Sequence, residues 1–293
     1  MFTVLLGFSG ALAYGFADFL GGLSARRIRP LAVTSLTATV GIAPLLVGLV
    51  LLGGRFTPAA FIWGAVAGVS GSVGVLLLYA ALAIGPMSVL SPVTSVFSAI
   101  LPVVFAVAFG THLSPVAVAA IIVAIIGVIL VSVSRSASGA RLTVRGLVLA
   151  TVAGCGFGGL VLAYDMTSPA DGVAPLLVAR LIQALLMSAA LVVTKKWRAE
   201  ATSPKSHMPR LGRNFWLIVV ACGVLDAAAN VFIQAALHLS PSPTTLPTVS
   251  VLNALYPVGT IVLASVVLRE RLTTSQMGGI ALGIAASVAL ALG

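Results

Sequence analysis

Long apolar stretches, separated by short polar or basic turns, run through the whole chain. Each stretch is close to the roughly 20 residues that a helix needs to cross the hydrocarbon core of a bilayer. Because lipid offers the backbone no hydrogen bonds, such segments must be helical, and they are too long for the strands of a barrel. The pattern therefore predicts ten helices, at residues 2–23, 31–52, 59–81, 88–109, 114–132, 143–164, 173–194, 214–236, 246–267 and 274–292.

A block of prolines occurs twice within this apolar pattern. Its prolines are Pro86, Pro92 and Pro102 and, 155 positions later, Pro241, Pro247 and Pro257. Three prolines at one fixed offset indicate a duplicated unit, so we expect two repeats, residues 1–135 and 143–293, with five helices each. A membrane unit with an odd number of spans inserts its second copy upside down, and this arrangement places a binding site near the bilayer midplane.

The composition is typical of an integral membrane protein. Of the 293 residues, 60% are hydrophobic and 8% are charged, and the mean hydropathy is +1.19. These values lie far outside the usage of soluble domains. Cys155 and Cys222 fall well inside predicted helices, so we interpret them as small apolar residues rather than as a disulfide or metal pair. No metal or cofactor is expected.

The basic residues are distributed unevenly between the two sides of the predicted helices. Fourteen of the 16 Lys and Arg residues follow the first, fifth, seventh and ninth helices. By the positive-inside rule this side faces the cytoplasm, and both termini lie on the extracytoplasmic side. The net charge of +10 is therefore a topology signal and not a sign of nucleic-acid binding. The first stretch has no basic residue before it, so we interpret it as a retained helix rather than a signal peptide.

Three ionisable side chains lie inside the predicted helices, namely Asp18, Arg180 and Asp226. Such groups cost about 2.5–3.5 kcal/mol at the bilayer centre on insertion scales, so each requires an explanation. Arg180 and Asp226 are expected about 10 and 15 Å from the outer ends of their helices, at 1.5 Å per residue, and so at similar depth. A pair between them would neutralise two buried charges. The alternative is that Arg180 binds a substrate carboxylate and Asp226 binds an ammonium group or a proton.

Asp226 begins a polar stripe, because Asn230 and Gln234 follow it at helical spacing. In lipid such a stripe must face the bundle interior or a wet cavity, and its alternative role is to join helices. Asp18 follows Tyr14 by one turn, nearer the cytoplasmic end of its helix. It is either a proton-sensitive group on the substrate path or a partner of the arginines at the interface.

Equivalent polar positions in the two repeats add further candidates. Ser95 and Ser98 correspond to Ser250 and Asn253, and polar pairs related in this way are expected at a midplane site. Serines in membrane helices also serve packing, so Asn253 is the stronger of these candidates. The candidate substrate-binding residues are Tyr14, Asp18, Tyr79, Ser95, Ser98, Arg180, Asp226, Asn230, Gln234, Asn253 and Tyr256.

Prolines and glycines predict how the helices bend and pack. Pro102 and Pro257 lie within equivalent stretches, and each removes one backbone hydrogen bond. They are candidate hinges for alternating access, and static curvature is the alternative. The glycines of the third stretch predict a face that a neighbouring helix approaches closely. These glycines are Gly64, Gly68, Gly71 and Gly74.

Two motifs carry a family resemblance. The first is Tyr79–Pro92, continuing to Leu101–Pro102, and the second is Leu268–Thr273 with its Arg–Glu–Arg–Leu–Thr turn. Both resemble signatures of the EamA family of the drug/metabolite transporter superfamily, and the resemblance covers the whole chain. The first repeat departs from the second motif, since it has Gly110–Ser114 at that turn. This departure predicts that the two repeats are not strictly symmetrical.

The resemblance implies an all-α integral membrane protein with ten transmembrane helices, arranged as two inverted five-helix repeats, in a prokaryotic cytoplasmic (inner) membrane. It also implies a secondary transporter that exports a small polar metabolite by alternating access, with amino acids and related compounds first among the classes. Arg180 is similar to an arginine common at this place in the family. The expected partners are the lipid bilayer, a small-molecule substrate and, as a candidate coupling ion, the proton, in a monomer or homodimer.

Other function classes fit the sequence less well than a secondary transporter. A lipid or lipid-linked head-group flippase would use the same scaffold, whereas a channel would be expected to show charged or carbonyl filter rings. Tyr164–Asp165 is similar to half of a presenilin-type motif, but its partner segment, Gly223–Asp226, lacks the second glycine of that motif. No histidine lies inside a predicted helix to activate a serine nucleophile. We therefore do not expect an enzyme.

Overall fold

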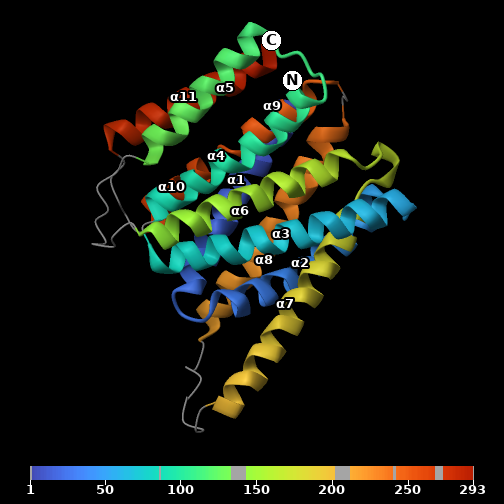
Figure 1. The fold of residues 1–293 in the computed structure, drawn as a ribbon, viewed down its shortest axis with the longest axis vertical. Helices are drawn as coiled ribbons and strands as arrows, with labels where there is room; N and C mark the ends of the chain where they lie inside the picture. Colours follow the sequence, from blue (N-terminus) through green and yellow to red (C-terminus); the bar gives the residue numbers. More distant parts are fainter. Residues whose placement is uncertain are drawn as a thin grey trace.

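The protein is a bundle of long helices (Figure 1). The computed structural model describes residues 2–85, 87–132, 143–201, 212–239, 242–267 and 273–292, and these ranges contain helices and turns but no strands. The elements are α1 (Phe2–Ala25), α2 (Pro30–Leu52), α3 (Pro58–Ile84), α4 (Met87–Ala108), α5 (Pro115–Ser132), α6 (Val144–Asp165), the short 3₁₀ helix η1 (Pro169–Asp171), α7 (Ala174–Ala201), α8 (Arg213–His238), α9 (Thr245–Asn253), α10 (Tyr256–Val267) and α11 (Thr274–Leu292).

The helices agree with nine of the ten predicted stretches, each of which corresponds to one helix. The stretch 246–267 differs, because it forms two helices, α9 and α10. Within the described ranges, seven helices are long and apolar enough to cross a membrane, and Val118–Gly127 in α5 is a shorter apolar segment. The chain is therefore a multi-pass, all-helical membrane protein.

The break between α9 and α10 has a local cause. Pro257 has no backbone N–H, so it cannot bond the carbonyl of Asn253 as a continuous helix would require. The chain turns instead at Ala254 and Leu255, whose N–H groups donate to Ser250 O and Leu252 O, each at 3.0 Å. Pro257 then occupies the first turn of α10, where a proline is well tolerated.

One helix is longer than predicted. The stretch predicted at 173–194 corresponds to α7, which continues as far as Ala201. Four parts of the sequence lie outside the described residues: the segment 134–142 near the junction of the predicted repeats, the segment 202–211 after α7, the turn at 268–272, and the prolines Pro86 and Pro241.

Capping residues define several helix ends. Thr57 and Thr143 accept hydrogen bonds from the backbone N–H groups of Ala60 and Gly146, both at 3.1 Å, and so cap α3 and α6. Pro58 supplies the first helical residue of α3. These caps place the helix starts close to the predicted positions, because the same threonine and proline signals are visible in the sequence.

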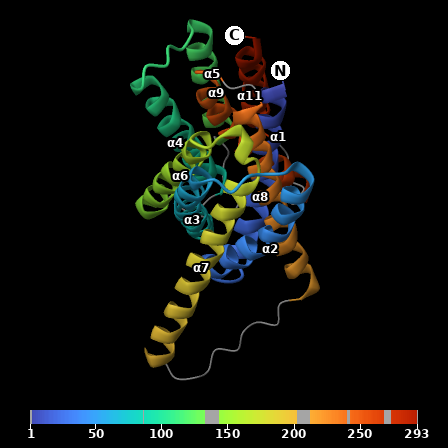
Figure 2. The same cartoon turned by 90° about the vertical axis from the view of Figure 1, so that its right-hand side faces the viewer.

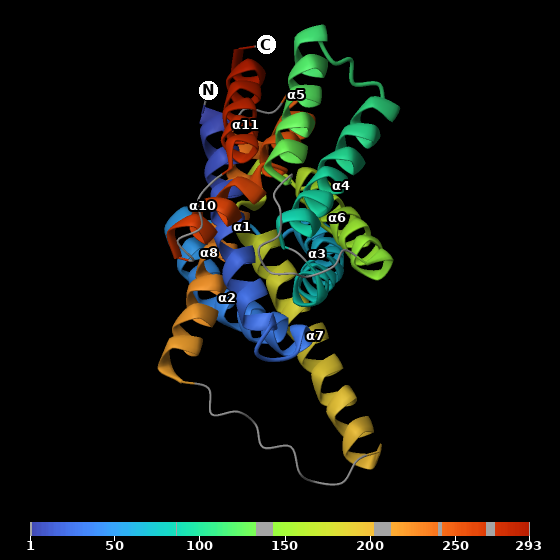
Figure 3. The same ribbon diagram turned by 90° about the vertical axis from the view of Figure 1, so that its left-hand side faces the viewer.

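The two halves of the chain interlock. Helix α3 packs on α6 and α1 packs on α8, so each of these pairs joins the first half to the second. The pairs α2 with α7, α4 with α9 and α5 with α11 also cross between the halves. Figures 1 and 3 show α5 and α11 side by side at the end of the bundle that carries both termini. Cavities inside the bundle are therefore lined by both halves.

Glycines allow these helices to approach closely. A Cβ atom at Gly64 would lie 2.8 Å from the carbonyl oxygen of Pro175, and one at Gly68 would lie 2.6 Å from that of Ala179. Both contacts are with α7, and a Cβ at Gly74 would meet the ring of Phe157 on α6 at 3.0 Å. The prediction that the glycines of this helix serve close packing is confirmed at these positions.

The two ends of the bundle differ. The N- and C-termini lie near one another at one end, and the C-terminal part of α7 extends beyond the other end (Figure 2). The turn between α1 and α2, which contains Arg26 and Arg27, lies toward the end to which α7 extends (Figure 3). The turn after α1 and the C-terminal end of α7 therefore lie toward the same end of the bundle.

Candidate functional site

One cavity lies between α1, α3, α6, α7 and α8, at the junction of the two halves. Its free volume is about 20 Å³ in this structure, room for a few water molecules at most. The lining residues are Tyr14, Ala67, Gly68, Gly71, Val75, Phe157, Leu160, Tyr164, Ala179, Arg180, Gln183, Asp226 and Asn230. We call it the arginine cavity.

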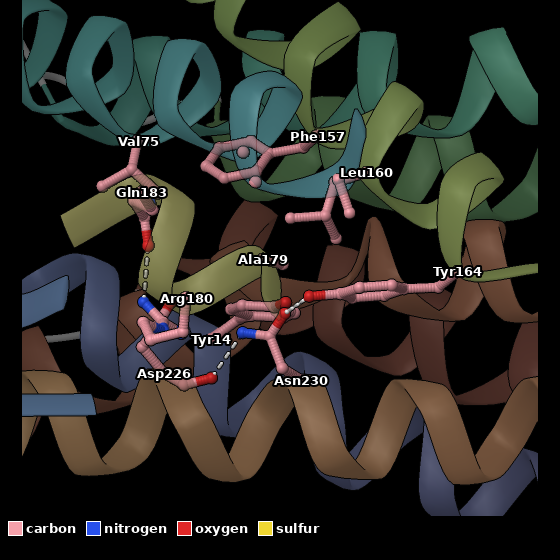
Figure 4. Close-up of a pocket in the computed structure, with 13 residues that line it drawn as sticks. Tyr14, Val75, Phe157, Leu160, Tyr164, Ala179, Arg180, Gln183, Asp226 and Asn230 are labelled. Atoms are coloured by element: carbon pink, nitrogen blue, oxygen red, sulfur yellow. Dashed lines mark hydrogen bonds and ion pairs between the residues drawn. The ribbon is translucent and has the colours of Figure 1, made fainter. Parts of the chain in front are cut away.

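Arg180 is the central charged group of the arginine cavity. Its side chain is 6% exposed, and it forms an ion pair with Asp226 on the neighbouring helix α8. Its Nη1 also donates to Gln183 Oε1 at 2.7 Å, one turn further along α7 (Figure 4). Among the described residues this is the only ion pair. The ion pair between Arg180 and Asp226, which their similar expected depth in the bilayer allows, is therefore present.

The fit of the guanidinium depends on a glycine of α2. A Cβ atom at Gly41 would lie 3.1 Å from Arg180 Nε and 3.3 Å from its Cζ. Such contacts are tighter than ordinary van der Waals packing, so Gly41 leaves the room that the guanidinium occupies. The guanidinium of Arg180 thus lies against the backbone of α2 at Gly41 and pairs with the Asp226 carboxylate.

Asn230 links Asp226 to the end of α6. Its Nδ2 donates to the backbone oxygen of Asp226 at 2.7 Å, and its Oδ1 accepts a hydrogen bond from the Tyr164 hydroxyl at 2.9 Å. Figure 4 shows Arg180, Asp226 and Asn230 on α7 and α8, opposite Phe157 and Leu160 of α6. The cavity therefore has a charged, hydrogen-bonded wall and an apolar wall.

A second cavity adjoins the first and has a free volume of about 10 Å³. Its lining residues are Tyr14, Asp18, Phe157, Leu160, Asn253 and Tyr256. Three of these residues, Tyr14, Phe157 and Leu160, also line the arginine cavity. We call it the aspartate cavity, because Asp18 is its only charged group. The shared lining makes the two cavities neighbouring parts of one region.

Asp18 faces this cavity rather than the basic turn. It is 6% exposed and forms no ion pair with any described residue, whereas Arg26 and Arg27 are exposed after the end of α1. The sequence left two interpretations of Asp18 open. The second, a contact with the interfacial arginines, is not present among the described residues.

The break between α9 and α10 forms the far side of the aspartate cavity. Asn253 ends α9 and Tyr256 begins α10. The Tyr256 hydroxyl donates to the backbone oxygen of Ser91 on α4 at 3.0 Å, which fixes the ring across the cavity. The other candidate hinge differs, because α4 continues as one helix through Pro102.

Four candidate residues lie outside the linings of both cavities. The Tyr79 hydroxyl lies 3.3 Å from Cys222 Sγ, and its ring fits against Gly21 of α1. Ser95 and Ser98 donate to backbone oxygens of their own helix, at 2.9 and 2.8 Å. Gln234 Nε2 donates to Thr167 Oγ1 at 3.0 Å. Tyr79 and Gln234 thus link their helices to α8 and to the turn after α6, whereas Ser95 and Ser98 bond within α4.

Several lining residues were not among the candidates from the sequence, namely Phe157, Leu160, Tyr164 and Gln183. Gln183 carried a usable signal, because it follows Arg180 at the spacing that places two side chains on one helix face. The aromatic and aliphatic residues carried none, since apolar side chains are common along every helix of a membrane protein. Within the described residues, no group of three or more His, Cys, Asp or Glu side chains is placed to hold a metal ion.

Both the sequence and the fold resemble those of known proteins. A model of the EamA-like transporter family matches residues 1–133 and 144–292. A solved structure described only as "Crystal structure of protein" is 19% identical to the chain, with a TM-score of 0.73, and the alignment covers 99% of this chain and 96% of that one. At this identity the likeness shows the fold alone. No curated protein matches.

Proposed function

The chain belongs to the EamA-like transporter family, and from this premise we propose that it is a secondary transporter that exports a small polar metabolite, with amino acids and related compounds first among the classes. The family is one of transporters within the drug/metabolite transporter superfamily. The proposal therefore concerns the substrate, the direction and the mechanism.

The observation that carries the proposal is the position of Arg180. A buried guanidinium with a planar fork of donors suits a carboxylate, which it can bind through two parallel hydrogen bonds. Arg180 lines a cavity that both halves of the chain enclose, beside Asp226 and Gln183. An incoming carboxylate would displace the Asp226 carboxylate from Arg180, and Asp226 would then take up a proton, because an unpaired carboxylate is costly in a buried site.

Alternating access fits the same geometry. A cavity between two interlocked repeats opens to one side or the other when the repeats tilt against each other. Pro257 marks a real break next to the aspartate cavity, and Pro102 lies in the equivalent helix of the first repeat. We propose both as hinge positions, the first at a discontinuity and the second within a continuous helix.

The lining of the cavities favours this function over the alternatives. A charged, hydrogen-bonded wall opposite an apolar wall suits a small polar metabolite, and the narrow space would widen when the repeats tilt against each other. A flippase for lipid head groups requires in addition a path for acyl chains along the bilayer. An enzyme is disfavoured by the family, whose members are transporters.

The setting in the cell is also part of the proposal. We propose a prokaryotic cytoplasmic membrane, and the basic turns support an orientation with both termini outside the cytoplasm. Labelling of single cysteines in intact cells tests this topology. A cysteine at position 27 and one at position 205 should both be protected from a membrane-impermeant reagent, and a cysteine at position 3 should react. Opposite behaviour of positions 27 and 205 would remove the basis for inverted repeats.

Proteoliposomes test the function directly. Purified protein is reconstituted, and uptake and efflux are measured for a panel of amino acids, sugars and cationic drugs at two pH values. For the amino acid that is transported, we expect Arg180→Lys to lower the initial rate by about tenfold or more, because lysine keeps the charge and loses the planar fork. Arg213→Lys, at the exposed start of α8, is the matched control and should transport normally. Full transport by Arg180→Lys would contradict the carboxylate role.

A further inference from the structure

Asp18 is a buried carboxylate that has no partner among the described residues. It is 6% exposed, and no described residue donates a hydrogen bond to it or pairs with it as a cation. A carboxylate in such a place is costly unless something compensates its charge. Asp226, the other buried carboxylate of this region, already has that compensation from Arg180.

A second oxygen in the aspartate cavity also lacks a donor. Asn253 is 4% exposed, and its Oδ1 has no hydrogen-bond partner among the described residues. Asn253 is also the last residue of α9. The C-terminal end of a helix carries partial negative charge, and broken membrane helices use such ends to hold cations. Two unsatisfied acceptors and a negative helix end thus meet in one cavity.

Aromatic rings form much of the remaining lining, from Tyr14, Phe157 and Tyr256. The Tyr256 hydroxyl is engaged with Ser91 O, so this residue offers its ring to the cavity and not a free donor. Aromatic faces attract organic cations, and this attraction is larger when the cation is desolvated. They give no ligands to a hard metal ion, which takes about six or more oxygen atoms.

We propose that the aspartate cavity binds the primary ammonium group of the transported substrate, with Asp18 as its counter-ion and Asn253 Oδ1 as a second acceptor. This inference rests on the proposed function, and it assigns the ammonium to Asp18 rather than to Asp226. A primary ammonium brings three N–H donors and one positive charge. The donors match the two carboxylate oxygens of Asp18 and Asn253 Oδ1, and the charge matches that of Asp18. The carboxylate of the same substrate lies in the arginine cavity, across the residues that both cavities share.

Because the two cavities share Tyr14, Phe157 and Leu160, we expect one small molecule to reach both charges. Tyr14 lines both cavities, and Asp18 follows it by four residues on α1. Four residues correspond to about 6 Å along a helix. A zwitterion is therefore the substrate class that satisfies Arg180 and Asp18 together, and an amine without a carboxylate should still bind at Asp18 alone.

A binding experiment on the full chain tests the assignment without transport. Purified protein in lipid nanodiscs is unfolded thermally in the presence of n-butylamine hydrochloride, of sodium chloride at the same ionic strength, or of sodium butyrate. We expect the amine to raise the unfolding midpoint above the value in sodium chloride, with an apparent affinity that Asp18→Asn lowers by about tenfold or more. Asn253→Ala should lower it less, because it removes a neutral acceptor.

The matched control is Asp165→Asn, which changes the same groups at the end of α6, outside both cavities. This variant should keep the full response to the amine. Three outcomes would overturn the assignment. They are an equal response to sodium chloride, no response to the amine in the unaltered protein, and an unchanged affinity for the amine in both Asp18→Asn and Asn253→Ala. If Asp18→Asn folds poorly, the Asn253→Ala result decides.

The outcome also separates this inference from the proposed function. If the amine binds through Asp18 and no amino acid is transported in proteoliposomes, the cation site stands and the transport proposal fails. If an amino acid is transported and the amine does not depend on Asp18 or Asn253, the transport proposal stands and the ammonium assignment fails.

Discussion

The two repeats place different chemistry at equivalent positions. In the second repeat, Arg180 and Asp226 form a buried ion pair beside a cavity. Ser35 corresponds to Arg180 at an offset of 145 positions, which also relates Pro30 to Pro175, and Gly71 corresponds to Asp226 at the offset of 155. Ser35 Oγ lies 2.9 Å from Ser188 Oγ on α7, and Gly71 leaves room for the side chain of Leu160. The repeats thus share a fold, and only the second uses these positions for charge.

A second difference lies in the equivalent helices that contain the prolines. Helix α4 runs unbroken through Pro92 and Pro102, whereas the corresponding stretch divides into α9 and α10 before Pro257. The broken copy lies beside the aspartate cavity and contributes Asn253 and Tyr256 to it. One copy of the duplicated helix is therefore a continuous support, and the other forms part of a site.

The largest expected effect comes from separating the ion pair of the second repeat. Arg180→Gln leaves the Asp226 carboxylate unpaired, and we expect a loss of stability of about 3–5 kcal/mol, because an uncompensated buried charge is costly. The combined variant Arg180→Gln/Asp226→Asn should recover most of that stability in thermal unfolding. A purely structural pair would recover transport as well, whereas a substrate-binding arginine leaves the combined variant folded and inactive.

A methyl group at the crossing of α1 and α10 should have the next largest effect. A Cβ atom at Gly15 would collide with the backbone oxygen of Tyr256, next to the helix break. We expect Gly15→Ala to cost about 1–3 kcal/mol, as is usual for overpacking. Gly212→Ala is the control, because a Cβ atom there meets nothing within 4 Å and the backbone φ is −69°. Equal stability of the two variants in chemical unfolding would show that the crossing is loose.

The two prolines give a smaller effect that addresses the comparison directly. Pro257→Ala restores a backbone N–H and allows α9 and α10 to join, so we expect a several-fold slower initial rate in proteoliposomes. Pro102→Ala should stay closer to the unaltered rate, because α4 is already continuous. Equal slowing by both substitutions would mean that the repeats bend alike during transport.

The smallest expected effect belongs to the first repeat. Ser35→Ala removes the contact with Ser188, and hydrogen bonds between membrane helices average about 0.6 kcal/mol. Ser188→Ala should cost a similar amount, and the combined variant should cost little more than either one, because they share the contact. Transport should be unaffected in all three. A strong transport defect in Ser35→Ala would place Ser35 itself on the transport path.

Much of the fold could be predicted because a membrane restricts the options. Lipid forces the backbone into helices, so the length of each apolar stretch located the helices closely. The division of 246–267 was harder to foresee, since Pro92 and Pro102 lie within a helix that does not break. Whether a proline bends a helix or ends it depends on its neighbours, here the tight contact of α10 with Gly15.

The site was only partly predictable. Arg180, Asp226, Asn230 and Asp18 stood out because a charged or amide group is costly in lipid. Tyr79 and Gln234 stood out for the same polarity, yet they bond to Cys222 and Thr167 away from the cavities. Polarity marks a side chain that requires a partner, and it does not say whether that partner is protein or ligand.

The order of residues by itself determined that this chain is a helical membrane protein built from a duplicated unit, because hydrophobic length and repeated prolines are local properties. Only the tertiary structure decided which polar groups find partners. It joined Arg180 to Asp226 and left Asp18 without a partner among the described residues, although all three are equally conspicuous in the sequence. The reason is that a hydrogen bond or ion pair depends on which helices pack together, and that packing is set by the close approach of glycine-rich faces distant in the chain.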